Sequence, residues 1–106
     1  MSDCIFCKIV KKELDTKLLR ETENLIVIKD INPQAAVHVL IVPKKHIKDV
    51  TQASDEIWKE IKDTAVYMAA EKGLKGFRLV HNAGETAAIP HLHVHFLGDV
   101  TPERAI

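Results

Sequence analysis

Apolar and polar residues along this chain alternate or cluster in a way that predicts five β-strands. The run at residues 36–43 is almost continuously apolar, which is typical of a strand buried on both faces, and Pro43 marks its end. Asn32-Pro33 is a turn signal before that run, and Glu23-Asn24 predicts a short turn between the first two strands. We expect strands at residues 17–22, 25–30, 36–43, 76–82 and 91–98.

One long helix is predicted between residues 54 and 73. Ser54 suits the N-cap, the acids that follow it suit the positive end of the helix dipole, and Lys72-Gly73 suits the C-terminal end. A short helix is expected within residues 6–14. The long helix has an apolar stripe at helical spacing, made of Ile57, Ile61, Ala65 and Met68, with Trp58 and Ala69 beside it.

These elements predict an α+β fold: a five-stranded antiparallel sheet with one long and one short helix, in a single domain that spans residues 1–106. Fifteen basic residues balance fifteen acidic ones, and this zero net charge gives no general attraction to nucleic acid or to a membrane surface. The longest apolar run is too short to span a bilayer, and the N-terminus has no apolar signal segment. We therefore expect a cytoplasmic protein.

Three histidines alternate with apolar residues near the C-terminus. In a strand, His91, His93 and His95 would share one face, and the residues between them would point into the core. A half-buried strand with a histidine-rich polar face is the plain interpretation. Two functional interpretations compete with it, because neutral imidazole is a common metal ligand and is also a competent nucleophile toward phosphorus.

Cys4 and Cys7 form a C-x₂-C pair near the N-terminus. Alone the pair is a weak zinc signal, because a structural zinc site needs two further ligands. A thioredoxin-like redox pair would require a βαβ context, which the strand pattern does not provide. Free buried thiols are the plain alternative.

The histidine segment, His-Leu-His-Val-His-Phe-Leu at residues 91–97, resembles the His-φ-His-φ-His-φ-φ signature of the histidine triad (HIT) nucleotide-binding family. The Asp-Ile-Asn-Pro-Gln-Ala block at 30–35 and the Pro-Lys-Lys-His-Ile block at 43–47 are similar to blocks of the same family. The similarity runs from about Cys4 to Gly98 and is to the Hint branch, the purine nucleoside phosphoramidases. It implies a HIT-like fold.

The resemblance also implies roles for individual residues. His93 would be the nucleophile that attacks the α-phosphorus of an adenosine 5′-phosphoramidate, forming a nucleotidyl-histidine that water then hydrolyses to AMP. His95 and His38 would line the phosphate site and stabilise charge on the phosphoryl oxygens. Asp30 would bind the ribose hydroxyls, although an acid at this position can also simply cap the turn that follows it.

A further set of positions matches the substrate-binding residues of the family. Asn82 matches a polar residue near the ribose and phosphate. The family usually has Gly-Gln-Ser or Gly-Gln-Thr before the triad, whereas Ala87 and Ala88 stand there in this chain and Thr86 is the nearby hydroxyl. Apolar residues that would otherwise belong to the core match the purine slot: Ile5, Phe6, Ile9, Ile28, Ile31 and Leu40.

The resemblance completes the metal hypothesis, because some HIT proteins bind zinc through such a cysteine pair plus two histidines. Here His46 and His91 occupy those positions and would make a closed, structural Cys₂His₂ site with Cys4 and Cys7. The resemblance also implies a homodimer, joined through the strand at 76–81. Two other functions stay open: a dinucleoside polyphosphate hydrolase, and a zinc- or nucleotide-binding regulatory module with little catalysis, which the Ala87-Ala88 departure favours.

Overall fold

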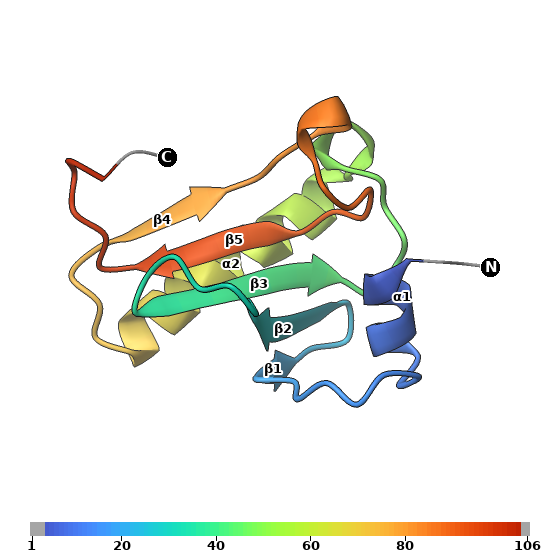
Figure 1. Ribbon diagram of the computed structural model, residues 1–106, viewed down its shortest axis with the longest axis horizontal. Helices are drawn as coiled ribbons and strands as arrows, with labels where there is room; N and C mark the ends of the chain where they lie inside the picture. Colours follow the sequence, from blue (N-terminus) through green and yellow to red (C-terminus); the bar gives the residue numbers. More distant parts are fainter. Residues whose placement is uncertain (1–3, 105–106) are drawn as a thin grey trace.

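The computed structural model describes residues 4–104, and within them the predicted α+β architecture is confirmed (Figure 1). The five strands form one antiparallel sheet in the order β1-β2-β3-β5-β4. Among the described residues, no helix is long and apolar enough to cross a membrane. Along the chain the elements are α1 (Ile5–Val10), β1 (Arg20–Glu21), β2 (Leu25–Lys29), β3 (Val37–Pro43), the 3₁₀ turn η1 (Val50–Gln52), α2 (Asp55–Glu71), β4 (Phe77–Val80), the 3₁₀ turn η2 (Gly84–Thr86) and β5 (Val94–Gly98).

The long helix begins and ends where the sequence predicts. The Ser54 hydroxyl accepts a hydrogen bond from the Ile57 N–H at 3.1 Å, which satisfies one of the unpaired donors of the first turn. Lys72 is the C-cap, and Gly73 follows with a φ of +64°, a left-handed conformation that glycine adopts without a steric penalty.

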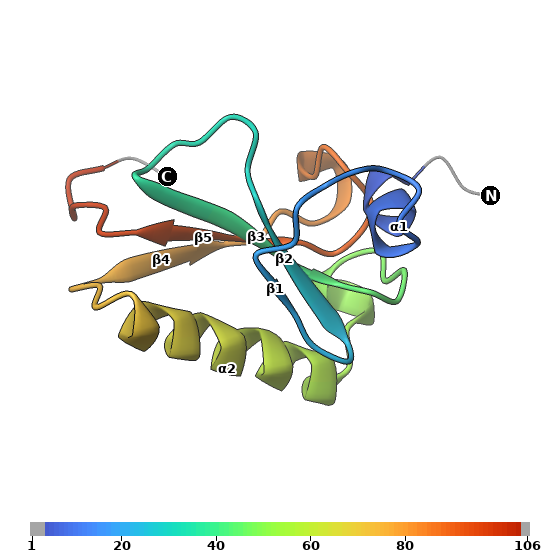
Figure 2. The ribbon, with the colours of Figure 1, turned by 90° about the horizontal axis from the view of Figure 1, so that it is seen from below.

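The two faces of the sheet are covered unequally (Figure 2). Helix α2 lies across one face and packs on the odd-numbered residues of β3, Val39 and Ile41, and on Phe96 of β5. On the opposite face, α1 covers only the end of the sheet near β2 and β3, where Phe6 and Ile9 pack with Leu40 and its neighbours. Within residues 4–104, no helix therefore covers the part of this second face that β5 and β4 form.

All five strands are shorter than predicted, and the differences at the first and the last matter most. The first expected strand, at residues 17–22, is reduced to Arg20–Glu21. The last begins at Val94, so His91 and His93 lie in an extended segment before β5 rather than within it. Alternation within one strand therefore does not explain the histidines: His91 and His93 are both buried, while His95 of β5 is partly exposed.

Pro43 explains why β5 starts late. In an antiparallel strand the N–H and C=O of one residue point to the same neighbour, and the Pro43 carbonyl faces the β5 side, where it accepts from His91 Nε2 at 2.8 Å. The N–H that proline lacks would lie on that same side, so the ladder between β3 and β5 cannot continue past it. The chain pairs instead with the next loop, where the Leu92 N–H donates to the Ile47 carbonyl at 2.6 Å.

Candidate functional site

His93 lies just before β5 and is held there by a main-chain hydrogen bond. Its Nδ1 is 2.8 Å from the carbonyl oxygen of His91. Because a carbonyl oxygen can only accept, Nδ1 carries the ring hydrogen and Nε2 carries the lone pair. The Phe6 ring packs against the imidazole at 5.1 Å between centroids, and His93 is only 6% exposed. The residue is thus fixed in the tautomer that nucleophilic attack through Nε2 requires.

His38 and His95 form a hydrogen-bonded pair across β3 and β5. The Gln34 backbone N–H donates to His38 Nδ1 at 2.9 Å, so the ring hydrogen of neutral His38 is on Nε2. That atom lies 2.9 Å from His95 Nδ1, which accepts, and His95 therefore keeps its hydrogen on Nε2. Burial lowers the pKa of His95, and the imidazoles of His93 and His38 lower it further, so the ring is neutral at pH 7.

His93 and His95 are thus neighbours in opposite tautomers, with 5.3 Å between their ring centroids. His93 presents a lone pair on its Nε2, and His95 presents an N–H on its own Nε2. A lone pair beside an N–H donor suits a reaction in which a nucleophile attacks phosphorus while charge grows on the phosphoryl oxygens.

Asp30 follows β2 and uses its two carboxylate oxygens differently. Oδ1 accepts the Asn32 N–H at 2.8 Å and so caps the turn, as the plain interpretation of this residue expects. Oδ2 lies 3.3 Å from His38 Nε2 and 3.6 Å from His95 Nδ1. The structure therefore brings Asp30 to the histidine pair while it also shapes the turn.

The other predicted substrate residues are distributed around this centre. Asn82 is half-buried and lines the same groove as His38 and His95, whereas Thr86 is exposed at the end of η2. Ile31 is 92% exposed and Ile5 is also exposed, so the structure does not bring these two into the apolar cluster. The remaining predicted purine-slot residues lie together in the core cluster under α1: Phe6, Ile9, Ile28 and Leu40.

A groove of about 430 Å³ opens on the uncovered face of the sheet, beside the histidine pair. Its size is within the range of small-molecule sites. Its floor is formed by side chains of β3, β4 and β5 that point away from α2, and Gln34 and the C-terminal segment contribute to its rim. The lining residues are Gln34, His38, Arg78, Val80, Asn82, His95, Leu97 and Arg104.

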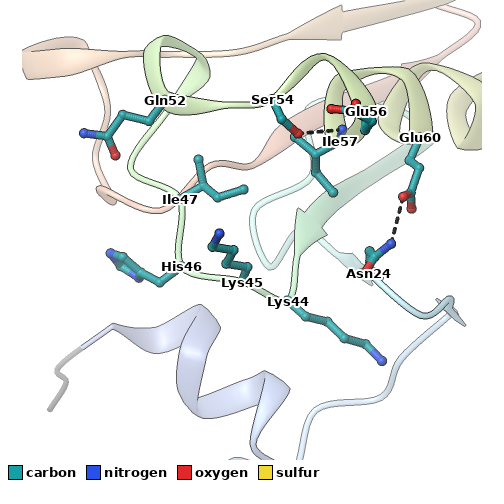
Figure 3. A pocket seen from close by; sticks show the side chains of 10 residues that line it. All are labelled: Asn24, Lys44, Lys45, His46, Ile47, Gln52, Ser54, Glu56, Ile57 and Glu60. Atoms are coloured by element: carbon teal, nitrogen blue, oxygen red, sulfur yellow. Dashed lines mark hydrogen bonds between the residues drawn. The ribbon is translucent and has the colours of Figure 1, made fainter.

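A second cavity of about 440 Å³ lies elsewhere, between residues 44–47 and the start of α2 (Figure 3). Lysines and glutamates both line it, and Asn24 Nδ2 donates to Glu60 Oε1 across it at 2.8 Å. It includes His46 but none of the paired imidazoles described above. The two cavities have similar volumes, so volume does not indicate which of them is the active site. The imidazole pair in the lining makes the groove with His38 and His95 the candidate active site.

Cys4, Cys7, His46 and His91 converge, although they come from α1, the loop after β3 and the segment before β5. Their four ligand atoms lie within 4.8 Å of one another. His91 Nδ1 is 3.2 Å from Cys4 Sγ, 3.6 Å from Cys7 Sγ and 3.1 Å from His46 Nδ1. These distances are within or slightly below the edges of a tetrahedral zinc site, in which bonds of about 2.0–2.3 Å place ligand atoms roughly 3.3–3.8 Å apart.

The His91 tautomer also fits this use. Nε2 donates to the Pro43 carbonyl, so Nδ1 presents its lone pair to the two sulfurs and to His46. Burial lowers the pKa of His91, which keeps the imidazole in the neutral form that binds a metal. The four residues can therefore hold a metal ion.

Comparisons with known proteins agree with this geometry. A family model described as "Scavenger mRNA decapping enzyme C-term binding" matches residues 3–105. Protein HitA of Neisseria gonorrhoeae is 34% identical over 104 residues, covering 92% of this chain and 97% of HitA. The chain belongs to the histidine triad (HIT) family. A solved HIT family hydrolase from Clostridium thermocellum is 42% identical to this HIT protein, with a TM-score of 0.88 and coverage of 100% of this chain and 98% of that one.

A zinc-bound HIT family protein from Mycobacterium smegmatis is 26% identical, with a TM-score of 0.84 and coverage of 96% of this HIT protein and 78% of that chain. Besides the Cys₂His₂ cluster, Asp30, His38 and His95 also lie close enough to share an ion. However, ligation through His38 Nε2 would move the ring hydrogen to Nδ1, where the Gln34 N–H already points. The Cys₂His₂ cluster is the better metal site of the two.

Two residues of this HIT protein support the site and were not foreseen from the sequence. His81, just after β4, donates from Nδ1 to the His93 carbonyl at 3.1 Å and accepts the Val50 N–H on Nε2 at 3.0 Å. Asp49 is buried, and its Oδ2 accepts the Gly84 N–H at 3.1 Å. Hydrogen bonds from Thr51 lower the pKa of Asp49 and keep it ionised. Asp49 has a local signal, because it caps η1 by accepting the Thr51 N–H at 2.9 Å. The bonds from Gly84 to Asp49 and from His81 to His93 have none, because each joins groups that are distant in sequence.

We expect His81→Phe to lower kcat/KM by about ten- to a hundredfold, because His93 loses the contact that fixes its main chain. Stability should also fall by about 1–3 kcal/mol, since a buried carbonyl loses its donor. His81→Asn is the matched control, because its amide N–H can occupy the position of Nδ1 and should restore most of kcat/KM. Steady-state kinetics with urea unfolding checks this, and equal rates for Phe and Asn at matched stability would contradict the positioning role.

Proposed function

We propose that this HIT protein is a single-domain hydrolase that cleaves purine nucleoside 5′-phosphoramidates through a nucleotidyl-His93 intermediate. The observation that carries the proposal is the pair of opposite tautomers at His93 and His95. His93 Nε2 attacks the α-phosphorus, the P–N bond breaks, and the amine leaves with a proton taken from solvent. Water then attacks phosphorus, the P–N bond to His93 breaks, and a nucleoside monophosphate such as AMP is released.

In this proposal His95 and His38 act as a unit. The Nε2–H of His95 donates to a phosphoryl oxygen and stabilises the charge that develops on it. His38 holds His95 in the required tautomer, and the Gln34 N–H holds His38 in turn. Because burial and neighbouring imidazoles depress the pKa of His95, its ring stays a neutral donor near pH 7.

The nucleoside would lie on the α1 side of the histidine pair. Asp30 Oδ2 faces the site and suits the ribose hydroxyls, while Asn82 lies near the phosphate end in the groove. The cluster of Phe6, Ile9, Ile28 and Leu40 supports an apolar purine site there. Ile5 and Ile31 are exposed and lie outside that cluster, and Thr86 is the hydroxyl nearest in sequence to the Ala87-Ala88 pair.

We expect His93→Ala to reduce turnover of an adenosine 5′-phosphoramidate by at least about a thousandfold, because the attacking atom is removed. AMP binding should persist, since the ribose and purine contacts remain. Calorimetry measures the binding, and intact mass after an alkaline quench should show the nucleotidyl adduct on wild type and not on the variant. Turnover that is unchanged in His93→Ala would refute the nucleophile.

The runner-up function is hydrolysis of dinucleoside polyphosphates through the same His93 chemistry. The observation that favours it is the presence of Arg78 and Arg104 in the groove next to His95, where phosphates of a longer substrate would lie. A binding module with little catalysis is the third candidate, and the Ala87-Ala88 pair supports it. AMP binding without hydrolysis of any phosphoramidate or polyphosphate would favour that third function over the other two.

We also propose that Cys4, Cys7, His46 and His91 bind one structural zinc ion. The ion would supply a rigid link between α1 and the segment that leads into His93, and the ligand-atom distances and the His91 tautomer support this assignment.

Elemental analysis of protein expressed with added zinc should find about one zinc ion per chain. Cys4→Ser should lose the ion and unfold at lower temperature, because a structural metal contributes to folding free energy. Asp30→Asn is the control and should keep its zinc, since Asp30 belongs to the other cluster. Metal-free wild-type protein, or zinc that is lost only in Asp30→Asn, would contradict this assignment.

The homodimer is proposed from the free edge of the sheet. Strand β4 is at one edge, and Phe77 and Leu79 on it are exposed, with the half-exposed Trp58 of α2 beside Leu79. Pairing two such edges across a two-fold axis would cover both strands and let the helices meet. Sedimentation at micromolar concentration should therefore show a dimer that Leu79→Lys converts to a monomer, and a monomeric wild type would contradict the proposal.

A further inference from the structure

The groove beside His95 has a strongly one-sided charge. Arg78 and Arg104 line it, together with the amides of Gln34 and Asn82, and no carboxylate is among its lining residues. Whole-chain charge gives no hint of this, because acidic and basic residues are equal in number. A local pair of guanidinium groups without acidic partners in the lining attracts anions.

The strand register places this charge close to the reaction centre. Val80 of β4 pairs with His95 of β5, and Arg78 pairs with Leu97. His95 and Arg78 are thus diagonal neighbours on the same face of the sheet, and such positions are about 7–8 Å apart. A substrate group that is attached to a phosphate at His95 and extends a few bonds toward β4 would therefore reach the Arg78 side chain.

Arg78 is held in place for such a contact. One of its terminal nitrogens, Nη1, donates to the Arg104 main-chain carbonyl at 3.0 Å, which ties the C-terminal segment to β4. A guanidinium group has five N–H donors, so most of them remain after this bond. A donor fork that is already ordered binds an oxyanion with little loss of side-chain entropy.

The direction of the reaction assigns the groove to one part of the substrate. In the proposed function the nucleoside lies on the α1 side, near Asp30 and Leu40, and the phosphate lies at His95. The leaving group departs in line, away from the attacking nitrogen. The groove lies beyond His95 on the β4 side, since Arg78 and Val80 of β4 line it together with His95.

We propose that this groove is the leaving-group subsite and that it selects a leaving group with an anionic oxygen group, either a carboxylate on an amine or a further phosphate. The assignment rests on the proposed function and specifies its substrate class. Arg78 and Arg104 bind the anion by charge-assisted hydrogen bonds. The same two cations repel an amine leaving group that carries a second positive charge, so the subsite discriminates by repulsion as well as attraction.

The test compares adenosine 5′-phosphoramidates that differ only at the end of the leaving amine. The glycine adduct ends in a carboxylate, the glycinamide adduct is neutral, and the ethylenediamine adduct is cationic. We expect wild-type kcat/KM to fall in that order, with about tenfold between the first two, the effect of one charged hydrogen bond. Diadenosine triphosphate forms a second arm, and whether it or the glycine adduct has the higher kcat/KM identifies which anion the subsite takes.

Arg78→Gln and Arg104→Gln should each bring the ratio of kcat/KM for the glycine adduct to kcat/KM for the glycinamide adduct toward one. The second variant leaves the main-chain carbonyl that accepts from Arg78 in place, so it removes charge without removing that tie. Lys62→Gln is the matched control, because it removes one positive charge from α2, on the other face of the sheet, and should keep the wild-type preference.

The outcomes separate the two levels of the proposal. Absence of turnover with every adduct and with diadenosine triphosphate overturns the proposed function, and the subsite with it. Turnover in which the neutral adduct equals or exceeds both anionic substrates overturns the subsite alone. A preference for the anionic substrates that survives in both arginine variants also overturns it, because the selectivity would then come from other groups.

Discussion

Main-chain hydrogen bonds determine where the ring hydrogens of His91, His93 and His38 lie, and the rest of the site depends on that. The Pro43 carbonyl fixes His91 and the His91 carbonyl fixes His93, so each imidazole presents the nitrogen that its proposed role needs. His81 adds a third such bond, to the carbonyl of His93 itself. Side-chain partners can rotate away, whereas carbonyls of an ordered backbone cannot, and this makes the arrangement rigid before any substrate is present.

The two faces of the sheet have different roles: one packs the hydrophobic core and the other carries the candidate site. The α2 side is filled by branched and aromatic side chains such as Ile41 and Phe96, which are fully buried. The other side carries the imidazole pair and the groove, with α1 covering only one end. Central strands β3 and β5 contribute to both faces, so the core that stabilises the fold also sets the spacing of His38 and His95.

Local signals in the sequence are sufficient for much of the fold. The Ser54 cap and Gly73 delimit α2 because capping is a contact between residues three or four apart. The late start of β5 was not predicted, because it depends on a proline that is about fifty residues away in sequence and adjacent only in the sheet. For the same reason His81 and Arg78 gave no signal: their partners, His93 and Arg104, come from other segments.

Pro43 couples two properties that are usually independent. One missing amide hydrogen both stops a strand pair and leaves a carbonyl oxygen for the His91 ring. An ordinary residue at this position would restore a donor on the β5 side and favour extension of β5 backwards through residues 91–93. The main chain at His91 and His93 would then compete for the hydrogen bonds that now set their protonation. The length of β5 and the positions of the ring hydrogens on His91 and His93 therefore both depend on Pro43.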